Sequence, residues 1–125
     1  PSSNAALVPV TTRSFQQAWT VADGLAALKQ NSVTGNPARG KELFRELSCV
    51  QCHRFGGNGG SLGPDLSAVA NRFSQHDILE ALVDPQKAVS DQFTLVPMPA
   101  ALLDTASAAD LRDLMSFLEA GPQRD

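Results

Sequence analysis

Apolar positions along this chain recur at intervals of three and four residues, which is the spacing of one face of an α-helix. The first repeat consists of Val21, Leu25 and Leu28. Thr20 and Asp23 precede it with the spacing of a capping box, so a short helix is expected here. Residues 1–13 show no such repeat and are expected to form a linker or an extended arm.

The second repeat begins just after Gly35, which breaks a turn-like stretch. Asn36 as N-cap and Pro37 at the first helical position are typical of a helix start. The predicted helix directs its apolar residues toward the core and is expected to continue up to the first cysteine. These apolar residues are Leu43, Phe44 and Leu47.

The last repeat predicts a helix near the carboxyl end of the chain. Ser107 and Asp110 have the spacing of a capping box, and Gly121-Pro122 is typical of a helix end. The apolar stripe consists of Leu111, Leu114, Met115 and Leu118, with Phe117 beside it. We predict that this helix, residues 108–119, crosses the earlier one, residues 37–47, and that Phe44 meets Leu114 and Phe117.

The middle of the chain predicts only short elements. Residues 56–64 are rich in glycine and are expected to lack regular structure. A short helix is predicted at residues 65–71, and another after the capping pair Ser74 and Asp77, ending before Pro85. Residues 90–104 are expected to be irregular. Since no alternating strand pattern of useful length occurs, the predicted fold class is all-α.

Composition and charge restrict the classes of function. The chain has 125 residues, enough for one domain, with 42% hydrophobic residues. Its net charge of −3 argues against binding to nucleic acid, which needs a basic face. No apolar run approaches the roughly 20 residues of a membrane span. Aromatic residues make up only 6%, a weak indication that another bulky apolar group lies inside.

The two cysteines of the chain lie in Cys49-Val50-Gln51-Cys52-His53, the pattern of c-type haem attachment. Two thiols three residues apart can reach the two vinyl groups on one edge of a porphyrin. His53 then directs its imidazole toward the iron through Nε2, while Nδ1–H donates to a nearby carbonyl. The alternatives are a thioredoxin-like pair, half of a zinc site and a simple disulfide. A thioredoxin-like pair would need a surrounding βαβ pattern, which the sequence lacks. A zinc site would need a second pair of ligands, and a simple disulfide would leave the adjacent histidine unexplained.

The opposite face of the iron needs a separate assignment. Met98 lies between Pro97 and Pro99 on a stiffened irregular segment, and thioether sulfur suits iron that changes between two oxidation states. Met115 is interpreted as a core residue of the last helix. His76 is the rival nitrogen ligand, and an open or water-bound site is the remaining alternative. Met98 is the predicted ligand.

From Gly40 onward the chain resembles the class I cytochrome c family. The matching motifs are Gly40-x-x-x-Phe44, Cys49-x-x-Cys52-His53, Gly63-Pro64-Asp65-Leu66, Met98-Pro99 and Leu114-x-x-Phe117-Leu118. The resemblance implies a fold of four to five short helices around one covalent haem c. It also implies that the Pro64 carbonyl accepts from His53, that Met98 is axial, and that two helices cross closely at Gly40.

A narrower resemblance covers nearly the whole chain. It is carried by Trp19, Asp23-Gly24-Leu25, Gly40 to Phe44, Ile78-Leu79-Glu80, Asp84 to Lys87 and Ser90 to Phe93. These residues are similar to the haem-binding domain fused to the C-terminal end of large exported membrane-bound dehydrogenase-like proteins. Those proteins carry a β-propeller that resembles sugar or quinoprotein dehydrogenases. Many such domains carry a β-rich insertion between the counterparts of Phe93 and Met98, where this chain has only four residues.

These observations predict an N-terminal arm with a short packing helix over residues 1–35 and a haem domain over residues 36–125. The expected function is one-electron transfer, from a fused or partner dehydrogenase to a cytochrome or oxidase. The alternative is a peroxidase or gas-binding haem with an open site, in which Arg72 is a distal catalyst instead of a surface residue or propionate partner. We expect a monomeric domain of a larger protein that is periplasmic or otherwise exported.

Overall fold

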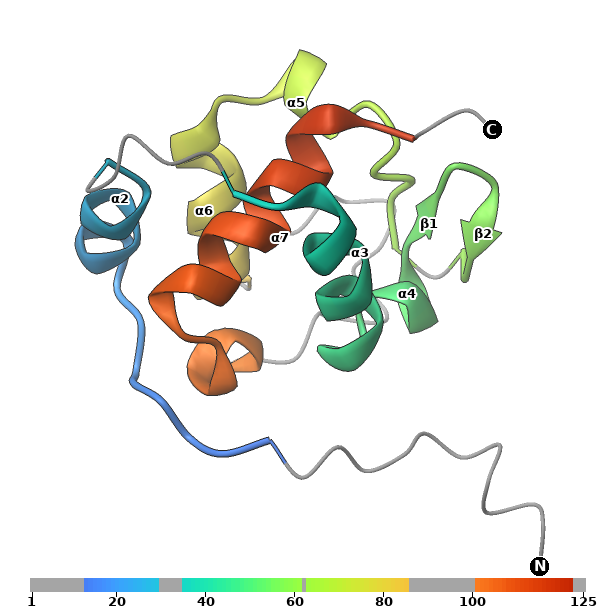
Figure 1. Ribbon diagram of the computed structural model, residues 1–125. Helices are drawn as coiled ribbons and strands as arrows, with labels where there is room; N and C mark the ends of the chain where they lie inside the picture. The colour runs from blue at the N-terminus through green and yellow to red at the C-terminus, as the bar shows by residue number, and fades with distance from the viewer. Residues whose placement is uncertain (1–12, 30–34, 62, 86–100, 123–125) are drawn as a thin grey trace, which may run out of the picture.

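The computed structural model describes residues 13–29, 35–61, 63–85 and 101–122. Within these ranges the chain is helical apart from one small hairpin, which confirms the all-α class. The helices are α2 Val21–Lys29, α3 Pro37–Glu46, α4 Cys49–Cys52, α5 Val69–Arg72, α6 Gln75–Val83 and α7 Ala108–Ala120, with the 3₁₀ helix η2 Leu102–Thr105. The strands are β1 Arg54–Phe55 and β2 Asn58–Gly59. In Figure 1, α7 runs through the middle, α2 lies at one end and the hairpin at the other.

Helix α3 begins where the sequence predicts and ends earlier than expected. The side chain of Asn36 accepts hydrogen bonds from the backbone N–H groups of Ala38 and Arg39, at 2.9 and 3.3 Å. The helix ends at Glu46 and does not continue to the cysteines. The reason is Ser48, whose φ of 69° lies in the left-handed region and interrupts a right-handed helix. The cysteines therefore lie on a separate short helix, α4.

Helix α7 confirms its predicted caps and its buried stripe. The Ser107 hydroxyl accepts from the Asp110 N–H, and the Asp110 carboxylate accepts from the Ser107 N–H, each at 3.1 Å. Gly121, with φ of 75°, follows the last helical residue. The buried residues of this helix are Leu111, Leu114, Met115, Phe117 and Leu118. Met115 is 1% exposed, which confirms its interpretation as a core residue.

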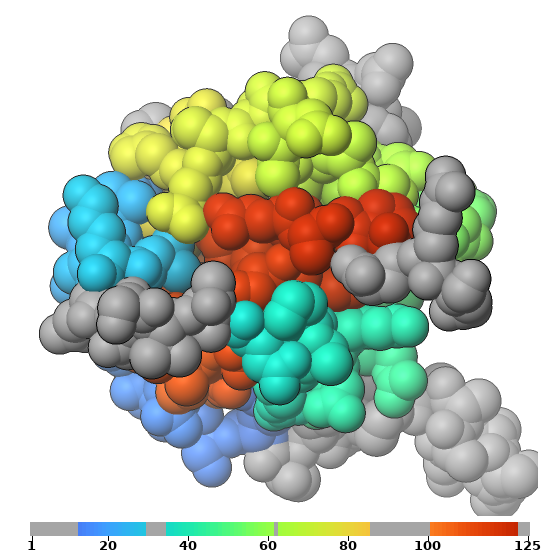
Figure 2. Space-filling view, turned by 45° about the horizontal axis from the view of Figure 1, so that its top comes forward, coloured from blue at the N-terminus to red at the C-terminus, as the bar shows by residue number. Residues whose placement is uncertain are grey.

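Helices α3 and α7 cross closely, as predicted. A Cβ atom at Gly40 would overlap the carbonyl oxygen of Asp113 and lie 2.6 Å from the Cβ of Phe117. The Phe44 ring centroid lies 5.5 Å from that of Phe117 and 5.8 Å from that of Phe55. Figure 2 shows α7 as a band between α3 and the segment that contains α5 and α6. Glycine at position 40 therefore allows the two backbones to approach until the three rings meet.

The expectation that residues 56–64 lack regular structure was wrong in part. Asn58 and Gly59 pair with Arg54 and Phe55 in an antiparallel hairpin. Gly56 and Gly57 have φ of 62° and 87°, and two consecutive positive φ values close the two-residue turn that suits a hairpin. The glycines that argue against a helix here are thus the residues that permit the hairpin.

Two short helical segments also differ from their predictions. The helix expected over residues 65–71 is limited to α5, because the Asp65 side chain accepts from the Ser67 N–H at 2.8 Å and so favours a turn. Residues 102–104, expected to be irregular, belong to η2, which ends at Thr105. Most of the remaining segment expected to be irregular lies outside the described residues.

Helix α2 faces the core with its small residues. Gly24 and Ala27 are buried, whereas the predicted stripe of Val21, Leu25 and Leu28 is only partly buried at the margin of the core. A Cβ atom at Gly24 would lie 2.7 Å from the Leu79 side chain of α6, so close packing decides which face turns inward. The helix contacts both α6 and α7. In the described part of the chain, no helix is long and apolar enough to cross a bilayer.

Candidate haem site

The cysteine motif occupies one turn of helix and the residue that follows it. Cys49 is buried and Cys52 is half-buried, and neither forms a disulfide. Residues three apart in a helix lie on the same face, so both thiols belong to one side of α4. The His53 N–H donates to the Cys49 carbonyl at 2.9 Å, and then the backbone turns to an extended conformation at His53.

The imidazole of His53 is oriented by a backbone carbonyl. Its Nδ1 atom lies 2.7 Å from the carbonyl oxygen of Pro64. Because a carbonyl oxygen only accepts, Nδ1 carries the proton and donates it, and the lone pair of the neutral ring is on Nε2. The structure thus contains the hydrogen bond that the family resemblance implies. It leaves Nε2 as the nitrogen with which His53 would bind a metal.

The segment after the hairpin closes against the motif through its backbone. The Gly60 N–H donates to the Val50 carbonyl at 2.9 Å, and the Gly63 N–H donates to the Cys52 carbonyl at 2.7 Å. A Cβ atom at Gly63 would lie 2.7 Å from Cε1 of His53. Glycine is therefore needed at position 63 if the imidazole is to keep its place beside the Pro64 carbonyl.

A small polar cluster holds the Pro64 segment in position. The Ser67 hydroxyl donates to the Asp65 carboxylate at 2.6 Å and accepts from the Gly56 N–H at 2.8 Å, while the Leu66 N–H donates to the Arg54 carbonyl at 2.9 Å. Hydrogen bonds from Ser67 lower the pKa of the Asp65 carboxyl. This cluster was not among the residues predicted for the site, although Asp-x-Ser is the spacing of a side-chain turn.

These residues fit a covalently attached haem. Cys49 and Cys52 would hold it through thioether bonds, and His53 would bind the iron through Nε2. Burial raises the pKa of the Cys49 thiol to about 12, so this sulfur is neutral at pH 7. A thioether carries no ionisable proton and is equally suited to an apolar position. With both thioether bonds formed, the site would combine two uncharged sulfur atoms with one oriented imidazole.

The remaining candidate residues are Met98, His76 and Arg72. Met98 lies outside the described residues. His76 is exposed in the first turn of α6, where its Nδ1 lies 3.9 Å from Oδ1 of Asp77. Arg72 is also exposed, with its guanidinium carbon 5.5 Å from the ring centroid of Phe73. The roles of Met98 as axial ligand and Arg72 as propionate partner stay predictions.

Comparison with known proteins supports the same chemistry. No curated protein matches the chain significantly. The family model described as Cytochrome c matches residues 37–121, which begin at α3 and end just after α7. This match covers more than half of the 125 residues and includes the motif, the Pro64 segment and the α3–α7 crossing. The chain therefore belongs to the cytochrome c family and carries covalently bound haem c.

Proposed function

We propose that this domain transfers single electrons between redox proteins, with His53 and Met98 as the axial ligands of the haem iron. When bound, haem c supplies an iron that changes its oxidation state by one electron. Domains of the cytochrome c family are generally electron carriers and not enzymes, and residues 37–121 match this family. A six-coordinate centre suits this function because it leaves no position open for a substrate.

The observation that carries the proposal is the oriented imidazole of His53. Its Nδ1 donates to the Pro64 carbonyl at 2.7 Å, and this carbonyl is held by a segment with its own hydrogen bonds. A ligand oriented in this way keeps its geometry when the charge at the metal changes, so little reorganisation accompanies electron transfer. The hydrogen bond also increases the basicity of the ligating nitrogen.

The choice of Met98 is supported by the position of the other methionine. The chain contains two methionines, and Met115 is 1% exposed among the packed residues of α7. Because Met115 is buried in the core, Met98 is the methionine that we propose as the ligand. A sulfur ligand stabilises ferrous iron relative to a nitrogen or water ligand and so raises the reduction potential.

A Met98→Ala variant tests this assignment. We expect it to lose the sulfur–iron charge-transfer absorption of the oxidised protein, to lower the reduction potential and to admit carbon monoxide to the iron. Met115→Leu is the control, with an unchanged spectrum and a loss of less than about 1.5 kcal/mol in unfolding free energy. An unchanged spectrum in Met98→Ala would instead favour His76 or an open site.

The alternative of a peroxidase or gas-binding haem predicts a high-spin spectrum for the unmodified protein. Arg72, the distal catalyst considered for that function, is exposed and stacks on Phe73. No described contact of Arg72 therefore favours the enzymatic alternative. The visible spectrum of the oxidised wild-type protein distinguishes the two functions directly.

We further propose that the electron donor is a dehydrogenase domain of the same polypeptide and that the protein is exported. The support is the resemblance carried by Trp19, Asp23-Gly24-Leu25 and the residues that follow them to Phe93. Haem is attached to c-type chains outside the cytoplasm, in a compartment that otherwise favours disulfides. The complete reading frame should encode a β-propeller dehydrogenase domain and an export signal upstream, and a frame with neither would contradict this assignment.

A further inference from the structure

An N-terminal segment outside the family match binds the turn that precedes α7. This segment, residues 13–19, is called the arm below. The backbone carbonyls of three consecutive residues accept hydrogen bonds from it. Asp104 accepts from the N–H groups of Gln16 and Gln17 at 2.7 and 3.2 Å. Thr105 accepts from the Arg13 guanidinium at 2.9 Å, and Ala106 accepts from the Trp19 indole N–H at 2.9 Å.

Arg13 connects this turn to the two central helices. Its guanidinium donates to Oγ1 of Thr105 at 3.1 Å, to the Asp110 carboxylate of α7 at 2.8 Å and to the Glu46 carboxylate of α3 at 2.6 Å. The Arg13 side chain is only 16% exposed. One side chain thus joins the turn to the rigid α3–α7 pair, and hydrogen bonds to charged groups are stronger than those between neutral groups.

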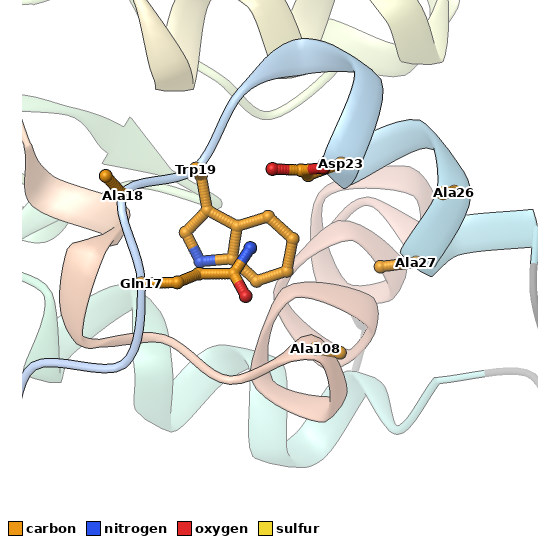
Figure 3. A pocket seen from close by; sticks show the side chains of 7 residues that line it. All are labelled: Gln17, Ala18, Trp19, Asp23, Ala26, Ala27 and Ala108. Carbon is orange, nitrogen blue, oxygen red and sulfur yellow. The ribbon is translucent and has the colours of Figure 1, made fainter.

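Trp19 forms the other end of the arm. Its side chain belongs to the core and the residue is 8% exposed. Figure 3 shows the indole in an open hollow between α2 and the start of α7, which Ala27 of α2 and Ala108 of α7 also line. The indole N–H therefore binds the Ala106 carbonyl from a position that packing already fixes. Because both Arg13 and Trp19 are anchored, the arm can hold the turn between them.

The turn itself has a conformation that needs such support. Ala101 has φ of 66°, in the left-handed region that disfavours residues with a Cβ atom. The Asp104 N–H donates back to the Ala101 carbonyl at 3.1 Å, and Leu103 is 2% exposed. Backbone strain of this kind persists only where the surrounding structure determines the conformation. Here the arm supplies four hydrogen bonds to the three carbonyls of residues 104–106, which follow Ala101 in the same turn.

The strained residue is close in sequence to the proposed iron ligand. Met98 precedes Ala101 by three residues, which span at most roughly 11 Å of extended chain. Fixing residues 101–106 therefore restricts the positions that the Met98 sulfur can reach. We propose that Arg13 and Trp19 are positioning residues that hold Met98 on the iron through the 101–106 turn. This inference rests on the proposed function, in which Met98 is the axial ligand.

Titration of the oxidised holoprotein with imidazole tests the coupling. Imidazole binds only where sulfur has left the iron, so its apparent affinity reports the fraction of protein with an open site. We expect Arg13→Ala to bind imidazole about tenfold more tightly than wild type, the effect of a loss of about 1.4 kcal/mol in sulfur ligation. Trp19→Phe keeps a smaller aromatic ring at this position but removes the N–H, and we expect about a threefold change for the loss of this weaker neutral bond.

Arg39→Ala is the matched control. Arg39 binds the same Glu46 carboxylate at 2.7 Å, but its other partner is Glu42 on its own helix. This variant loses the same charge and a bond to the same carboxylate without losing a contact to residues 101–106. We expect its imidazole affinity to equal that of wild type. Equal affinities for Arg13→Ala and Arg39→Ala would overturn the proposal.

Two further measurements separate the possible failures. Hydrogen exchange of the backbone N–H groups of Asp104 and Ala106 should be about tenfold faster in Arg13→Ala, and unchanged exchange would show that the arm does not hold the turn. The spectrum of Met98→Ala tests the ligand itself. One outcome is that the spectrum of Met98→Ala differs from wild type while Arg13→Ala and Trp19→Phe bind imidazole like wild type. In that case the proposed function stands and the positioning role is wrong. If Met98→Ala is spectrally unchanged, both are wrong.

Discussion

At the scale of single residues, the site depends on one imidazole and the backbone around it. His53 would supply the nitrogen that binds the iron, the Pro64 carbonyl sets the orientation of its ring, and Gly63 leaves room for the ring. None of these effects requires a charged partner. The orientation is instead produced by a neutral hydrogen bond and by the absence of a side chain, so small changes of volume should matter more than changes of charge.

Gly63→Ala tests this dependence. The added methyl group would lie 2.7 Å from Cε1 of His53, so the ring must move and its hydrogen bond to Pro64 must lengthen. We expect a loss of about 1–3 kcal/mol in unfolding free energy, the usual cost of overpacking, together with a shifted reduction potential. Ser61→Ala, at an exposed position of the same loop, is the control for both measurements.

Phe44→Ala tests the aromatic contact at the helix crossing. Phe44 is 4% exposed and its ring is 5.5 and 5.8 Å from two other phenylalanine rings. We expect the variant to lose about 3–5 kcal/mol of unfolding free energy, measured by denaturant titration. Phe73→Ala is the matched control, since Phe73 is 48% exposed, and it should change stability by about 0.5 kcal/mol or less. Similar losses in both variants would contradict the crossing.

At the scale of elements, local caps set where helices begin, and charged side chains connect elements that are distant in sequence. The N-caps of α3 and α6 and the capping box of α7 define where these helices begin, and the ion pair of Glu46 with Arg13 joins α3 to the arm. Glu46 receives hydrogen bonds from both Arg13 and Arg39. The bond from Arg39 is the main reason why the pKa of the Glu46 carboxyl is lowered from its ordinary value of 4.5.

This lowered pKa predicts a pH dependence of stability. A carboxyl with a lower pKa in the folded state contributes stability that is fully present above the unfolded-state pKa and is lost as the pH falls through the folded-state pKa. Below pH 4.5 the free energy of unfolding should therefore decrease more steeply in wild type than in Glu46→Gln. Parallel pH profiles for the two proteins, measured by urea titration, would exclude this contribution.

At the scale of the whole molecule, one covalent group completes a small all-α domain. The described core gathers residues from α2, α3, α6 and α7, and the motif helix α4 lies against α3. A haem held by two thioether bonds should remain attached when this packing is lost. We expect the matured protein to keep its haem through denaturation and acid–acetone extraction, with a mass equal to the chain plus one haem. A bare polypeptide from cells that mature cytochromes would contradict this expectation.

Much of the fold was predictable because its signals are local. The caps at Asn36 and Ser107 and the buried stripe of α7 each follow from residues within a few positions of one another. The predictions that needed correction involve backbone conformation. Ser48 ends α3 before the motif, and the two glycines at 56 and 57 close a hairpin, because of φ values that these residue types permit but do not require.

The chemistry of the site follows from the sequence, because two cysteines three residues apart share one side of a helical turn and the histidine comes directly after them. How that chemistry is supported depends on the folded chain. The Pro64 carbonyl beside His53 and the carbonyls of residues 104–106 beneath the arm are acceptors that every residue possesses. A backbone carbonyl has no signature in the sequence, so only folding selects the carbonyl groups that accept these hydrogen bonds.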